Sequence, residues 1–149
     1  MSTDSSSQIL EVPHQQGMIT RIPFPTLNNV PLQLPAYNHI VEIAREDNIC
    51  NWLAFIDADE FLSPERPEHG LDDLYNIMND DSIGAIAINW ASYGSSNYIV
   101  PNDEHVVNCF VYRSENSHHS NKPYKSIVKL ATFNHSGPTT HAFVIKKCY

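Results

Sequence analysis

The chain has 149 residues, of which 42% are hydrophobic and 17% are charged, which is typical of one globular domain and not of a disordered or fibrous chain. Nine Lys and Arg against 17 Asp and Glu give a formal net charge of −8, which argues against nucleic-acid binding because such proteins need a basic surface. No apolar run of about 18 residues could span a membrane, and residues 1–7 lack the basic and apolar parts of a signal peptide. Three widely spaced cysteines form no disulfide or metal pattern, so we expect a cytoplasmic protein, with peripheral membrane attachment as an open alternative.

The predicted elements alternate between strands and helices. In chain order we expect a strand at 18–22, a helix from about 37 to 47, a strand at 52–56, a helix at 71–78, a strand at 83–88, a helix at 106–111 and strands at 126–130 and 142–145. The apolar run 52–56 is too short for a helix and favours a central strand that is buried on both faces. The alternation predicts an α/β fold with a mostly parallel sheet.

An acidic cluster follows directly after the predicted strand 52–56. Asp57 and Asp59 would point to the same side if the backbone stays extended, because side chains of a strand alternate with a period of two. Ligands bind at the carboxyl ends of strands in open α/β sheets, and two carboxylates there suit Mg²⁺ or Mn²⁺ completed by phosphate and water. The alternative is a solvated loop in which Asp59 or Glu60 only caps the next element.

A second class of enzyme also places an Asp-x-Asp motif after an apolar strand. In phosphatases of the haloacid-dehalogenase type the first aspartate, here Asp57, is a nucleophile. That pattern requires Thr or Val two residues after the second aspartate, where this chain has Phe61. Its strand also comes first in the domain, whereas a strand and a helix are predicted before residue 52.

Residues 52–62, WLAFIDADEFL, resemble the signature of a glycosyltransferase group related to family two. Other segments resemble further motifs of this group in the same order: STDSS at 2–6, QLPAYN at 33–38, NWASYGSS at 89–96, KSIV at 125–128 and HAF at 141–143. The chain departs from the group in three ways. The strand and helix before the STD turn are missing, Asn97 replaces a glycine, and the chain stops soon after the last motif.

The resemblance implies a three-layer α/β sandwich of GT-A type over residues 1–149, with a mostly parallel sheet that lacks its first strand. It implies transfer of a sugar from a nucleotide-sugar donor, with UDP as the expected nucleotide, to a saccharide acceptor. Mn²⁺ or Mg²⁺ would be the cofactor, and the anomeric carbon would be inverted. A catalytically inactive fragment or binding module of the same fold is the second hypothesis. The missing strand would leave an open sheet edge, for which we expect self-association.

The resemblance also implies roles at the donor site. Asp59 would bind the metal directly, and Asp57 would contact the ribose, or the metal through water. His141 would be a third metal ligand, although a lone histidine can equally be an ordinary loop residue. Asp4, in the STD turn, would contact the donor. Lys125 would neutralise diphosphate charge, or else be a solvated charge at a strand edge.

On the acceptor side, Trp90 and Tyr93 would offer an aromatic face to the sugar, with core packing as the alternative for Trp90. Asp103 and Glu104 are the candidates for the general base that deprotonates the acceptor hydroxyl. The alternative for both acids is an ordinary exposed loop position.

Overall fold

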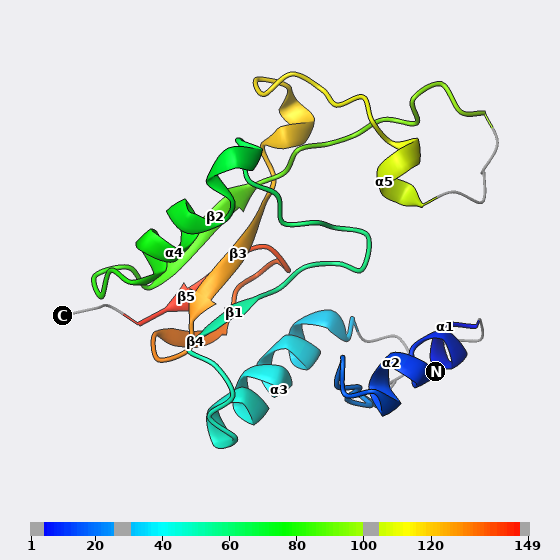
Figure 1. Ribbon diagram of the computed structural model, residues 1–149. Coiled ribbons are helices and arrows are strands. Elements are labelled where there is room, and N and C mark those ends of the chain that lie inside the picture. Colours follow the sequence, from blue (N-terminus) through cyan, green and yellow to red (C-terminus); the bar gives the residue numbers. More distant parts are fainter. Residues whose placement is uncertain (1–4, 26–30, 100–104, 147–149) are drawn as a thin grey trace.

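The computed structural model describes residues 5–25, 31–99 and 105–146 as a mixed α/β protein (Figure 1). In chain order its elements are α1 (Ser6–Ile9), α2 (Glu11–Gln15), α3 (Gln33–Glu46), β1 (Trp52–Ala54), the 3₁₀ turn η1 (Pro67–His69), α4 (Asp72–Met78), β2 (Ala85–Asn89), α5 (Val106–Cys109), the 3₁₀ turn η2 (His119–Asn121), β3 (Tyr124–Lys129), β4 (Phe133–Ser136) and β5 (Phe143–Ile145). Three predicted site residues, Asp4, Asp103 and Glu104, lie outside the described residues. Within the described part, no helix is long and apolar enough to cross a membrane.

The strands form two small antiparallel sheets. The larger has the order β1-β3-β2, and β3 runs antiparallel to both neighbours, while β4 and β5 pair separately. The α/β class is therefore confirmed, but the mostly parallel sheet is not present among the described strands. β1 and β2 do run in the same direction, as a strand–helix–strand pattern predicts. β3 lies between them and runs the opposite way, so neither of them has a parallel partner among the described strands.

The central strand is β3, and the prediction that 52–56 would be central is wrong. Residues Lys125 to Val128 of β3 are all buried, whereas β1 is only partly buried and its Ala54 is exposed. β1 and β2 are the two outer strands of this sheet. The apolar sequence of 52–56 could not distinguish a central strand from an edge strand, because an edge strand that is covered on one face can be as apolar as a central one. The expected self-association through an open edge stays a prediction.

The hydrophobic core lies between α3 and the two sheets. Val41 and Ala44 of α3 pack with Val128 of β3 and Phe133 of β4, as the helical spacing of the apolar residues predicted. Phe55, just after β1, stacks on Phe143 of β5 with ring centroids 4.6 Å apart. This aromatic packing joins the smaller sheet to the larger one and fixes the positions of the chain segments that follow β1 and precede β5.

Two predicted elements differ from the structure, and one strand was not predicted. Residues 18–22 form no strand; they follow α1 and α2, and Arg21 is tied back to Glu11 by an ion pair of 2.9 Å. α5 is a single turn that ends at Cys109 instead of reaching 111. The hairpin strand β4 was not predicted, because its sequence FNHS has one apolar residue and no alternation.

Candidate active site

One end of the larger sheet brings together residues that are far apart in the sequence. Ala54 of β1 pairs with Ile127 of β3, and Ile88 of β2 pairs with Lys125. Since β3 is antiparallel to both neighbours, the ends of β1 and β2 lie beside the start of β3. The residues after β1, those after β2 and Lys125 therefore meet at this end.

Residues 57–60, which we call the acidic turn, do not continue the strand. The N–H of Glu60 donates to the carbonyl of Asp57 at 3.1 Å, and the N–H of Asp57 donates to the Glu60 carboxylate at 2.8 Å. These two hydrogen bonds close a turn, so the backbone is not extended here. The period-two alternation that predicted Asp57 and Asp59 on the same side therefore does not apply. The placement of both acids at the carboxyl end of a strand is confirmed.

Lys125 connects the acidic turn to the central strand. Its Nζ lies 2.8 Å from Asp57 Oδ2 and 3.2 Å from Glu60 Oε2, and its side chain is only 8% exposed. Burial lowers the pKa of Lys125, but the hydrogen bonds and charges of the two carboxylates outweigh it, so its pKa lies above the ordinary lysine value. The ammonium group is therefore charged and held between two acids. The sequence indicated for Glu60 only a possible role as a cap of the next element. The segment KSIV at 125–128 did not by itself indicate that Lys125 and Glu60 would meet.

Asp59 is the carboxylate of the acidic turn that remains open. It is exposed, and within the described residues its carboxylate makes no hydrogen bond or ion pair. Residues 5–25, 31–99 and 105–146 contain no group of three His, Cys, Asp or Glu side chains that could hold a metal. Mg²⁺ commonly takes only one or two protein carboxylates and completes its shell with substrate phosphate and water. The acidic turn thus fits an ion shared with a substrate.

His141 and Trp90 lie near this end of the sheet, with their rings in contact. The ring centroids are 5.4 Å apart in an edge-to-face arrangement. The carbonyl of His141 accepts a 2.6 Å hydrogen bond from the Ser126 hydroxyl. Ser126 and Lys125 are neighbours on β3, so their side chains leave opposite faces of the sheet, which places the His141 backbone away from the face of Lys125. The predicted ligand role of His141 stays a prediction without geometric support.

Two buried polar atoms of this aromatic pair have no partner among the described residues: Nε1 of Trp90 and Nδ1 of His141. Buried donors and acceptors of this kind are uncommon in folded proteins. Trp90 is partly buried, so the core-packing alternative describes its indole at least as well as an open acceptor face does.

Tyr93 follows β2 in the chain and precedes α5. α5 lies away from the two sheets (Figure 1). Its side chain is 51% exposed, and its backbone bridges to Arg113. Asn97, which stands where the resembling group has glycine, has a φ of 69°. Asparagine tolerates this left-handed conformation better than most residues, so the replacement preserves a backbone shape that glycine would allow.

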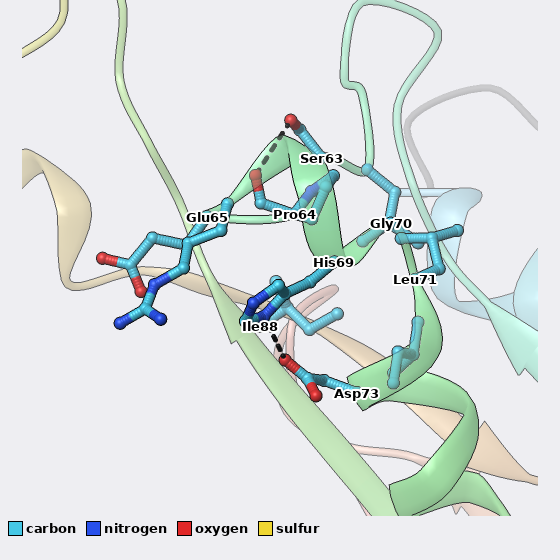
Figure 2. A pocket seen from close by; sticks show the side chains of 11 residues that line it. Ser63, Pro64, Glu65, His69, Gly70, Leu71, Asp73 and Ile88 are labelled. Carbon is cyan, nitrogen blue, oxygen red and sulfur yellow. Dashed lines mark hydrogen bonds and ion pairs between the residues drawn. The ribbon is translucent and has the colours of Figure 1, made fainter.

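A hollow of about 410 Å³ is lined by the loop that follows the acidic turn, by α4 and by β2 (Figure 2). Leu62 and Ser63, which come soon after Glu60, line one side, and Ile88, the cross-strand neighbour of Lys125, lines another. Figure 2 shows the ring of His69 directed toward Asp73, with which it pairs at 3.5 Å. The sequence did not indicate this hollow, because it forms only where the loop after the acidic turn, α4 and β2 meet.

Residues 1–144 match the model of the family described as glycosyltransferase family 92. No curated protein and no solved structure is significantly similar to the chain. The resemblance to glycosyltransferases is thereby confirmed, while the grouping with family two stays a prediction. Because the match covers nearly all of the sequence, the chain belongs to glycosyltransferase family 92, and this membership implies sugar transfer.

Proposed function

We propose that this domain transfers a sugar from a nucleotide-sugar donor, with UDP as the expected nucleotide, to a saccharide acceptor at the acidic end of the sheet. The supporting observation is the acidic turn: Asp57 and Asp59 follow β1 at its carboxyl end, and Asp59 is free of other described contacts. A GT-A type of domain and inversion at the anomeric carbon belong to the same proposal, and they rest on the sequence resemblance.

The proposed cofactor is Mn²⁺ or Mg²⁺, held by Asp59 and by the oxygen of Asp57 that Lys125 does not contact. When bound with the donor, such an ion acts as a Lewis acid that stabilises the departing nucleoside diphosphate. The protein's own contribution is to hold the two carboxylates at a fixed place beside the sheet. Asp57 is fixed through its N–H and one carboxylate oxygen, and Asp59 supplies an unpaired charge. His141 is left out of this set because its backbone lies on the other face.

The acceptor side of the proposal rests on sequence reasoning. Tyr93 is exposed enough to contact a sugar, and Trp90, which directly follows β2 in the chain, is partly buried. Asp103 and Glu104 remain the proposed general bases and Asp4 a proposed donor contact, and all three lie outside the described residues.

Calorimetric titration with UDP, with and without Mn²⁺, tests the donor site. Asp59→Asn should lower Mn²⁺-dependent UDP affinity by at least about tenfold, because it removes a charged ligand, and should leave the melting temperature nearly unchanged. Asp81→Asn is the matched control, since Asp81 is a fully exposed acid that pairs with a β3 lysine at the other end of the sheet. Equal UDP affinity in the parent and in Asp59→Asn would contradict the assignment.

The same titration separates this proposal from the inactive-fragment hypothesis. A folded parent chain that binds no UDP at saturating Mn²⁺ would favour a domain that does not hold the donor. The phosphatase alternative has lost its support, because the family match points to sugar transfer.

A further inference from the structure

We propose that Lys125 is a positioning residue that serves as the built-in counter-ion of the acidic turn and leaves Asp59 as the carboxylate open to a ligand. This inference rests on the proposed function for the identity of that ligand, a divalent cation shared with a diphosphate. It differs from the role expected from the sequence, in which the lysine itself would neutralise the diphosphate.

The first step of the argument is that Lys125 has little capacity left for a phosphate. An ammonium group has three N–H donors, and both acids of the turn lie within ion-pair distance, at 2.8 and 3.2 Å. With the side chain 8% exposed, a phosphate oxygen has little access to the third donor. Giving up either carboxylate would leave the buried ammonium group with one counter-charge fewer, which is costly.

The second step is that the lysine determines which acids are engaged. Glu60 accepts a hydrogen bond from the Asp57 N–H and forms an ion pair with Lys125, so it closes the turn from within. Asp57 is held through one carboxylate oxygen. Asp59 takes no part in these contacts and is exposed. The position of Lys125 therefore determines that Glu60 and Asp57 are held in contacts within the protein, while Asp59 is left exposed.

The third step concerns electrostatics. A fixed positive charge beside Asp57 competes with any cation that binds the same carboxylate, and charges about 5 Å apart near a protein surface interact by a few kcal/mol. Lys125 should therefore weaken the binding of a divalent cation in the absence of nucleotide. A bound diphosphate would bring the negative charge that offsets the lysine, so cation and nucleotide should bind cooperatively.

Binding of Mn²⁺ alone, followed by electron paramagnetic resonance, tests the counter-ion role in Lys125→Met, Lys125→Arg and Lys129→Met. We expect Lys125→Met to bind Mn²⁺ about tenfold more tightly than the parent, because a competing charge is removed. Lys125→Arg should bind like the parent. Lys129→Met is the matched control, since Lys129 is on the same strand and pairs with Asp81, and it should show no change.

A second measurement requires no metal. Hydrogen exchange at the amides of Asp57 and Glu60 should be faster in Lys125→Met and unchanged in Lys125→Arg. Only Lys125→Met loses the positive charge that pairs with both carboxylates and holds the turn closed. If Lys125→Met does not fold, Lys125→Gln, which keeps one donor group, replaces it in both measurements.

The outcomes distinguish three roles. A diphosphate contact would lower UDP affinity in Lys125→Met and leave Mn²⁺ binding and exchange unchanged, which would overturn the proposal. A purely structural lysine would weaken Mn²⁺ binding together with stability, which would also overturn it. If neither the parent nor any variant binds Mn²⁺, the metal part of the proposed function fails, and the exchange measurement alone decides the role of Lys125.

Discussion

The two ends of the central strand β3 each carry a lysine paired with an acid, yet the two ion pairs differ in burial and in the number of acids involved. Lys125 and Lys129 are four residues apart, so their side chains leave the same face of the sheet. Lys129 pairs with Asp81 at 2.8 Å and lies over the ring of Trp52, but Asp81 is fully exposed. Lys125 is buried and bridges two acids that are themselves held by a turn. An exposed pair contributes little, so the surroundings of an ion pair, and not the pair itself, distinguish a candidate site from ordinary surface.

The largest difference between the two ends should appear when one acid of each is neutralised. Glu60→Gln removes the ion pair with Lys125 and weakens the hydrogen bond from the Asp57 N–H, so we expect the unfolding free energy to fall by about 1–2 kcal/mol. Asp81→Asn should change stability by less than the error of a urea-unfolding experiment. Equal losses in the two variants would mean that the acidic turn is no more tightly held than the exposed pair.

A smaller difference in stability is expected between phenylalanine variants of the two tryptophans, Trp90 and Trp52. Trp90→Phe removes a buried N–H that has no described partner, and an unsatisfied buried donor costs about 1–3 kcal/mol. Trp52→Phe removes an indole that carries the Lys129 ammonium 5.9 Å from its ring centroid. Thermal unfolding should therefore show that Trp90→Phe is less destabilising than Trp52→Phe, by about 1 kcal/mol. The opposite order would indicate that the Trp90 N–H has a partner, such as an ordered water.

The smallest effect concerns Asp80, before β2 at the end opposite to the acidic turn. The hydroxyl and the N–H of Ser82 donate to Asp80 Oδ1 at 2.6 and 2.8 Å, and these bonds hold the pKa of Asp80 below its ordinary 3.8. A lowered pKa of a carboxyl group stabilises the folded state at pH values above the pKa of the unfolded chain. This contribution is lost as the pH falls through the lower pKa of the folded state. Ser82→Ala should raise the pKa of Asp80 toward 3.8, measured by carboxyl-carbon NMR, and should lower stability at neutral pH only slightly, because Asp80 is exposed to solvent. An unchanged pKa would show that the backbone N–H alone accounts for the shift.

Local features of the site were predictable because they depend on residues close in sequence. The helical spacing of Val41 and Ala44 indicated α3 and its buried face, and both are in the core. The apolar run before Asp57 indicated a strand that ends just before an acidic segment, and β1 does so. The shape of that segment was not predictable, because a turn closed by Glu60 and an extended strand end are both compatible with DADE.

The sequence by itself determined the glycosyltransferase identity, the α/β class, and the placement of Asp57 and Asp59 behind a strand, because ordered motifs and apolar periodicity are local properties of the chain. Only the tertiary structure decided that β3 lies between β1 and β2, and thus that the ladders are antiparallel. This strand order also decided the partner of the acids, because it brings Lys125 to Asp57, which lies 68 positions earlier in the chain. Strand order depends on long-range packing, here that of Phe55, Val128 and Phe133, which no local pattern encodes.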